Sequence, residues 1–109
     1  MRKINAKGGN PMYFVLLGYD GTDSEAMGRR MAARPAHLEA AKALKEAGVL
    51  KYGGPLLNEE GNMKGSILVL QFDSEEALRT EYLATEPYIT GDVWRTVEIH
   101  PHKPSDFFL

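Results

Sequence analysis

Two segments of the chain are apolar on both faces of an extended strand, and this feature limits the possible folds more than any other. Residues 12–19 (MYFVLLGY) and residues 66–72 (SILVLQF) carry large apolar side chains at odd and even positions alike. A strand with one face in water alternates apolar and polar side chains instead. Both segments are therefore expected to be covered on two sides.

Turn residues and prolines divide the chain into six elements. We expect strands and helices in the order 12–19, 25–47 (a helix interrupted at Arg34-Pro35), 49–53, 66–72, 74–85 (a second helix) and 93–100. The order β-α-β-β-α-β is typical of the α+β class and of the ferredoxin-like fold. In that fold a four-stranded antiparallel sheet carries both helices on one face.

Two helices cover only one face of such a sheet, so the other face needs a second cover. Leaving several large apolar side chains in water costs several kcal/mol at about 25 cal/mol per Å². This loss is comparable to the whole stability of a small domain. We therefore expect a homodimer in which two sheets close into a dimeric α+β barrel and shelter a hollow beside His37. The alternative is a monomer with an exposed apolar patch.

Composition excludes several classes of protein. The 109 residues include 13 basic and 15 acidic side chains, for a net charge of −2, which does not favour a nucleic-acid partner. The absence of cysteine excludes disulfides and thiol nucleophiles. No apolar run reaches the roughly 18 residues of a membrane span. We expect a cytoplasmic protein without a membrane partner, in which residues 1–11 form a flexible arm (or an extra edge strand) and residues 12–109 a single domain.

His37 and Glu86 are the candidate catalytic residues. Pro35 suits the first turn of a helix, and the positive end of a helix dipole favours a neutral imidazole at His37, which can act as a general base. Pro87 holds Glu86 in an extended conformation at a helix end, where its carboxylate can orient His37 or shuttle a proton. The alternatives are a histidine satisfied by packing and a solvated surface glutamate.

Other polar residues predict less. Ser66 can donate a hydrogen bond to a bound oxyanion, and Gly54 allows a ligand to approach the backbone. We expect Arg95 to reach water at the sheet edge. His100 and His102 lack an obvious third ligand, so no metal site is expected. No phosphate-binding glycine motif is present in the sequence, and no cofactor is expected.

Several segments together resemble the YciI-like family. They are the Arg34-Pro35-Ala36-His37-Leu38 run, Gly53-Gly54-Pro55-Leu56, Gly65-Ser66, the helix entry at residues 72–77 (FDSEEA), and Glu86-Pro87-Tyr88, where the family usually reads Asp-Pro-Tyr or Asp-Pro-Phe. The resemblance covers roughly residues 12–104. It implies a dimeric α+β barrel related in fold to muconolactone isomerases.

The resemblance also implies a histidine–aspartate pair in a cleft. The histidine corresponds to His37, and Glu86 stands where the family has aspartate, with Asp92 as a nearby substitute. One branch of the family is similar to dehydrochlorinases of chlorinated hydroxyquinols, which use acid/base chemistry without a cofactor. Two hypotheses follow. The chain is either a cofactor-independent lyase or isomerase acting on a small molecule, or a non-catalytic, ligand-binding or regulatory homodimer. For the enzyme, the expected pocket residues are Tyr13, Gly54, Ser66, Tyr88 and Trp94.

Overall fold

The computed structural model describes residues 12–108, and the predicted arm at 1–11 lies outside them. The main elements are β1 (Met12–Asp20), α1 (Ala26–Glu46), β2 (Leu50–Leu57), β3 (Met63–Phe72), α2 (Glu75–Ala77), α3 (Pro87–Thr90) and β4 (Trp94–His102). A π-helical segment, η1 (Leu78–Tyr82), and two 3₁₀ segments, η2 (Leu83–Thr85) and η3 (Asp106–Phe108), complete the list.

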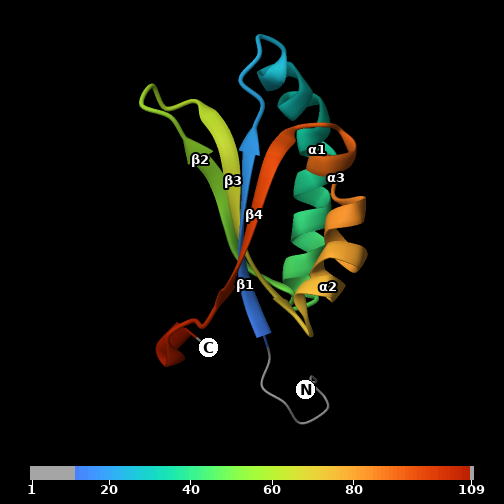
Figure 1. The fold of residues 1–109 in the computed structure, drawn as a ribbon, viewed down its shortest axis with the longest axis vertical. Coiled ribbons are helices and arrows are strands. Elements are labelled where there is room, and N and C mark those ends of the chain that lie inside the picture. Colours follow the sequence, from blue (N-terminus) through green and yellow to red (C-terminus); the bar gives the residue numbers. More distant parts are fainter. Residues whose placement is uncertain (1–11, 109) are drawn as a thin grey trace.

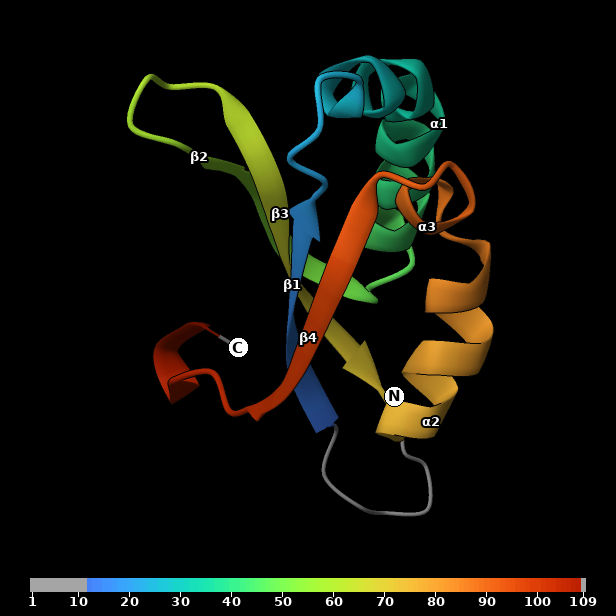
Figure 2. The same cartoon turned by 45° about the horizontal axis from the view of Figure 1, so that its top comes forward.

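The four strands form one antiparallel sheet in the order β2-β3-β1-β4. The long helix α1 and the α2–α3 region lie together on one face of this sheet (Figure 1), and the turned view shows the same two layers (Figure 2). The predicted α+β class and ferredoxin-like arrangement are confirmed. No helix formed by residues 12–108 is long and apolar enough to cross a membrane.

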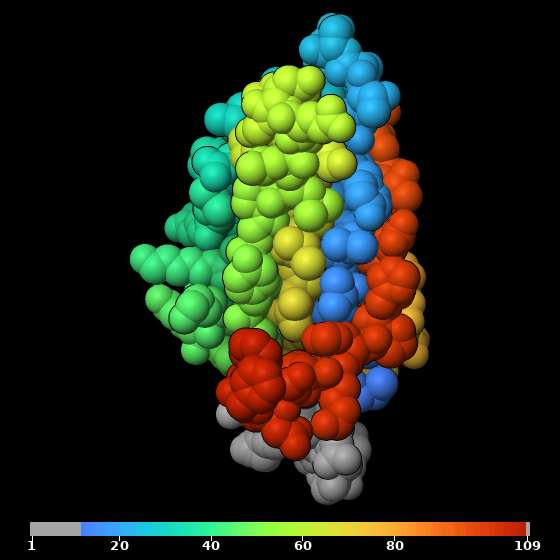
Figure 3. Space-filling model, turned by 90° about the vertical axis from the view of Figure 1, so that its left-hand side faces the viewer, coloured from blue at the N-terminus to red at the C-terminus, as the bar shows by residue number. Residues whose placement is uncertain are grey.

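The strand side chains divide between two different environments. Those that face the helices, such as Phe14, Leu16 and Leu70, are fully buried. Those on the opposite face, such as Val15 and Val69, are only half-buried. Figure 3 looks onto that opposite face, where β2, β3, β1 and β4 run side by side and the C-terminal residues lie across one end. Packing against the helices therefore explains the apolar side chains on one face of the sheet. Most of the other face is not covered by any part of residues 12–108.

The first helix differs from the prediction, because α1 runs through Pro35 without interruption. Pro35 lies on the exposed side of the helix, and so does Met31, whose carbonyl loses its usual N–H partner. Water can satisfy that carbonyl, so the proline is tolerated. His37 consequently lies in the middle of a helix and not in a first turn, and the dipole argument for it was wrong.

Two other elements differ from the prediction. Strand β2 continues through Gly53-Gly54-Pro55 to Leu57, because each of these residues pairs with β3. The second helix begins as predicted, with the Ser74 hydroxyl accepting from the Ala77 N–H at 3.0 Å. It then widens into η1 and tightens into η2 before the short helix α3, which was not predicted.

Candidate active site

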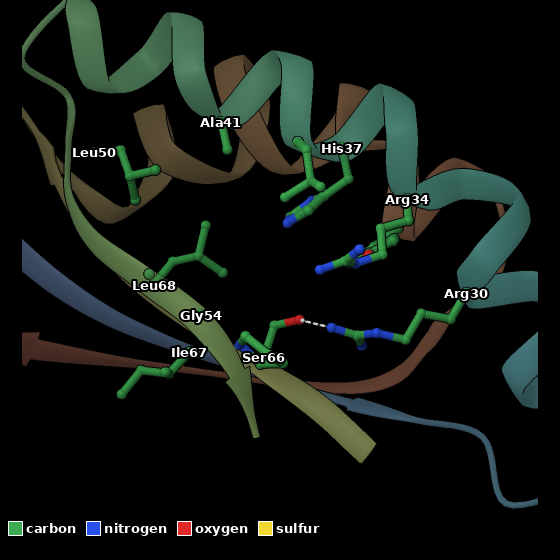
Figure 4. Close-up of a pocket in the computed structure, with 13 residues that line it drawn as sticks. Arg30, Arg34, His37, Ala41, Leu50, Gly54, Ser66, Ile67 and Leu68 are labelled. Carbon is green, nitrogen blue, oxygen red and sulfur yellow. Dashed lines mark hydrogen bonds between the residues drawn. The ribbon is translucent and has the colours of Figure 1, made fainter. Parts of the chain in front are cut away.

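Helix α1 presents one stripe of side chains to the sheet. Arg30, Arg34, His37 and Ala41 follow the spacing that keeps residues on one helix face, and the close-up shows all four directed toward the strands (Figure 4). His37 is 8% exposed and Arg30 is 2% exposed. The stripe thus places two basic groups and an imidazole against β2 and β3.

Glu86 is positioned by the start of α3. Its backbone is extended (φ −67°, ψ 127°), Pro87 occupies the first helical position, and the Glu86 carboxylate accepts from the Tyr88 N–H at 3.1 Å. The same carboxylate oxygen lies 2.5 Å from His37 Nδ1. Glu86 is only 3% exposed, so it is not a solvated surface residue. An ionised carboxylate can only accept, so Nδ1 is the donor in this pair, and in a neutral ring this leaves the free lone pair on Nε2.

Aromatic rings hold the imidazole in place. The Tyr88 ring stacks on His37 with centroids 3.9 Å apart and an interplanar angle of 11°. Trp94 meets His37 edge-on at 6.1 Å. Burial raises the pKa of the Tyr88 hydroxyl, so Tyr88 serves as a neutral platform.

A buried ion pair supports the other side of the site. Arg30 donates to both carboxylate oxygens of Asp20 at 3.0 and 3.1 Å and to the Ser66 hydroxyl at 3.0 Å. The Trp94 indole N–H donates to the same hydroxyl at 3.2 Å. The Arg30 guanidinium also lies 4.7 Å from the centre of the Tyr88 ring. Sequence reasoning missed this network, although Arg30 lies on the same helical stripe as His37, seven residues earlier.

A cavity of about 100 Å³ lies between α1 and the strands β2 and β3. Arg34, His37, Ser66 and Tyr88 contribute its polar side chains, and the remaining lining is mostly apolar: Leu38, Ala41, Leu50, Gly53, Gly54, Pro55, Ile67 and Leu68, with Arg30 at the buried end. The cavity belongs to the helix-covered face of a single chain. The expectation that a second copy would form the hollow beside His37 was therefore wrong.

The predicted pocket residues separate into two groups. Gly54, Ser66 and Tyr88 line the cavity, and Trp94 lies directly behind Ser66. Tyr13 lies on the other face of the sheet, where it borders a second hollow beneath the C-terminal segment. The structure therefore brings four of the five together around His37.

Comparison with known proteins connects this geometry to a family. A model of the YCII-related domain matches residues 12–103. The chain belongs to the YCII-related family. The protein YciI of Escherichia coli is 30% identical over 98 residues, covering 84% of this chain and 97% of that protein.

Two further relatives have informative names. A protein of Emericella nidulans named "Derivative of benzaldehyde biosynthesis cluster protein C" is 38% identical over 73 residues, covering 61% of this chain and 74% of that protein. Among solved structures, 5-chloro-2-hydroxyhydroquinone dehydrochlorinase of Burkholderia phenoliruptrix, in complex with 2,5-dihydroxybenzoquinone, is similar with a TM-score of 0.73. That match is 20% identical and covers 88% of this chain and 98% of the other. At this identity the structural likeness concerns the fold.

The resemblance implies an aspartate at the position of Glu86, and the longer glutamate side chain meets the imidazole. Asp92 does not substitute for it. The Asp92 side chain is exposed and pairs with Arg95, which is itself exposed as predicted. Glu86 therefore forms a buried histidine–carboxylate pair with His37 in this chain.

The remaining sequence candidates lie away from the site. His100 contacts Glu98 at 3.1 Å on the exposed face of β4, and His102 borders the second hollow. Residues 12–108 contain no group of three side chains of the kinds that hold a metal ion. The turn residue Asp23 pairs with Arg29 at 2.7 Å, which holds the pKa of that carboxyl well below its ordinary value.

Proposed function

We propose that the chain is a cofactor-independent acid/base enzyme of the lyase or isomerase type, acting on a small organic molecule in the cavity beside His37. The observation that supports this most strongly is the buried His37–Glu86 pair, whose 2.5 Å contact occupies Nδ1 and leaves Nε2 without a hydrogen bond within residues 12–108. His37 also lines the cavity. A base needs this combination of a held tautomer and a free lone pair.

The chemistry follows from the proton positions. Nε2 of His37 takes a proton from a carbon or hydroxyl of the substrate, and Glu86 stabilises the imidazolium that forms. The electron pair left on the substrate then either expels a leaving group or shifts along a conjugated system. In the first case the imidazolium gives its proton to the expelled group or to water, and in the second it returns the proton to a different substrate atom. Tyr88 holds the ring plane throughout, because it stacks on the imidazole at 3.9 Å.

Relatives support this class of reaction without defining the substrate. The similar solved structure is named a dehydrochlorinase and holds a dihydroxyquinone. The fungal relative is named for a cluster that makes a benzaldehyde derivative. Both names concern small aromatic or quinonoid molecules, so such molecules are the first compounds to assay.

Proton exchange tests the proposal before the natural reaction is known. A panel of small hydroxyquinones and enolisable ketones is incubated with the protein in D₂O, and the loss of C–H signals is followed by NMR. We expect accelerated exchange for at least one compound and a loss of about 10²–10⁴-fold in His37→Ala. Glu86→Gln should lose a large part of the rate as well. His100→Ala, a change at an exposed histidine, is the matched control and should keep the full rate. Exchange that persists in His37→Ala would refute the mechanism.

The second candidate is a non-catalytic homodimer that only binds a small ligand. A histidine and a carboxylate separated by packing would favour that reading, whereas here the two side chains meet at 2.5 Å. Ligand binding without exchange or turnover of any bound compound would favour the binding protein.

We also propose that two copies associate through the sheet face opposite the helices. On this face Val15, Leu17 and Val69 are half-buried, and the helices α1 and α3 lie on the other side of the sheet. Sedimentation should give a particle of two 12.1 kDa chains. Val69→Lys should separate them, because a charge would enter the apolar contact. A wild-type particle of one chain at micromolar concentration would contradict the dimer. A cytoplasmic location is proposed as well, and cell fractionation tests it.

A further inference from the structure

The Ser66 hydroxyl has an unusual hydrogen-bond balance. Ser66 is 2% exposed, and its oxygen accepts from Arg30 at 3.0 Å and from the Trp94 indole at 3.2 Å. A hydroxyl has two acceptor lone pairs and one proton, so both lone pairs are already used. No hydrogen bond from the Ser66 proton is found within residues 12–108. Because Ser66 lines the cavity, its proton is available to an oxygen of a ligand bound there.

Arg34 is the second unmatched donor. Its side chain points from α1 into the same cavity (Figure 4). The other arginines of residues 12–108 each pair with a carboxylate: Arg29 with Asp23, Arg30 with Asp20, Arg79 with Glu75 and Arg95 with Asp92. Arg34 has neither an ion pair nor a hydrogen bond to any residue in that part of the chain. A half-buried guanidinium without a partner among the described residues is free to pair with an anion bound in the cavity.

The cavity walls describe the rest of the ligand. No aspartate or glutamate lines the cavity, and most of the other side chains that line it are apolar. The volume of about 100 Å³ lies below the roughly 150 Å³ of an engineered cavity that encloses benzene. Leu38, which lines the cavity, is itself exposed, so the cavity beside His37 opens to solvent there. A small body with one anionic oxygen group fits these walls.

We propose that the cavity selects a small organic acid bound as its carboxylate, with Arg34 pairing with the carboxylate and the Ser66 hydroxyl donating to one of its oxygens. This deepens the proposed function, because the same cavity holds the substrate for His37. The apolar or aromatic body of the acid then lies against Leu50 and Leu68, with Nε2 of His37 beside the carbon next to the anionic group.

The test measures binding and needs no turnover. Benzoate and benzamide have nearly the same shape and differ in charge. Trp94 is the only tryptophan, so its indole N–H gives a single assignable NMR signal, and its bond to Ser66 makes that signal a reporter of the cavity. We expect benzoate to shift the signal saturably, with an affinity at least tenfold higher than that of benzamide. Arg34→Gln should reduce benzoate affinity tenfold or more and leave benzamide unchanged, and Arg34→Lys should keep part of the preference.

Two controls identify the residue that holds the anion. Arg79→Gln removes the same charge from an exposed pair outside the cavity and should leave benzoate binding unchanged. The preference for benzoate should survive His37→Ala. Equal affinities for the two probes, absence of saturable benzoate binding in the millimolar range, or a preference that persists in Arg34→Gln would each overturn the proposal. These outcomes leave His37-dependent proton exchange untouched, and a failed exchange experiment leaves the benzoate preference untouched.

Discussion

The buried pair between Arg30 and Asp20 makes a quantitative prediction about stability. Their side chains are 3% and 5% exposed, and Arg30 Nη1 donates to both oxygens of Asp20. Asp20→Asn keeps the shape and removes the negative charge. It leaves a buried guanidinium whose Nε already lacks a hydrogen-bond partner in the described chain.

Breaking a buried pair in this way costs about 3–5 kcal/mol. Total stabilities of small domains are about 5–15 kcal/mol, so the loss should be a large share of the whole. The corresponding fall in Tm is on the order of 10–25 °C for a chain of this length. Urea unfolding and calorimetry measure both quantities.

Helix α1 and the turn before it offer a matched comparison. Arg29 and Asp23 form a pair of the same chemistry, but their side chains are 23% and 46% exposed. Asp23→Asn should therefore cost far less than Asp20→Asn, because water screens the exposed pair. The double variant Asp20→Leu, Arg30→Met should recover most of the stability, since it leaves no buried charge unpaired. Equal losses in Asp20→Asn and Asp23→Asn would refute the reasoning.

Three other predictions concern single residues. Gly18→Ala should destabilise the protein by about 1–3 kcal/mol and shift Trp94 fluorescence. The reason is that a Cβ at Gly18 would lie 2.5 Å from Cε2 and 2.6 Å from Cγ of the Trp94 indole. An unchanged emission spectrum and an unchanged urea midpoint would contradict this. Arg29 lowers the pKa of Asp23, so the stability that this pair contributes is complete above the ordinary pKa of 3.8 and fades as the pH falls below it. The difference in free energy of unfolding between wild type and Asp23→Asn should therefore shrink in acid. A difference that grows in acid would contradict the reasoning. Burial raises the pKa of Tyr82 above its ordinary 10.0, so the folded state keeps the proton and loses stability as the pH rises past that value. Tyr82→Phe should therefore gain stability relative to wild type as the pH is raised. Stabilities of the two proteins that fall in parallel with rising pH would count against this.

Local patterns were enough to predict the order of the strands and the sheet, although β2 runs beyond the predicted residue 53 to Leu57. Apolar residues at both parities of β1 and β3 indicated two covered faces, and the helix-facing half is buried as expected. Proline rules were less reliable in this chain. Pro35 was expected to break a helix, but an exposed carbonyl at Met31 makes its missing hydrogen bond inexpensive.

The candidate site was predictable in part. His37 and Glu86 are far apart in sequence, and their pairing followed from the family resemblance and not from spacing. The network of Asp20, Arg30 and Ser66 depends on how α1 packs on the sheet, a long-range property that no local pattern contains. Tyr13 was assigned to the pocket by residue type alone, and strand alternation places it on the other face.

The proton on the imidazole of His37 tests the central claim most directly. Long-range proton–nitrogen NMR distinguishes the two ring nitrogens of each of the three histidines, and His37→Ala identifies the signals of His37. We predict a proton on Nδ1 toward Glu86 and a bare Nε2 toward the cavity. A proton on Nε2 with a bare Nδ1, or protons on both nitrogens, would contradict the assignment of His37 as the base.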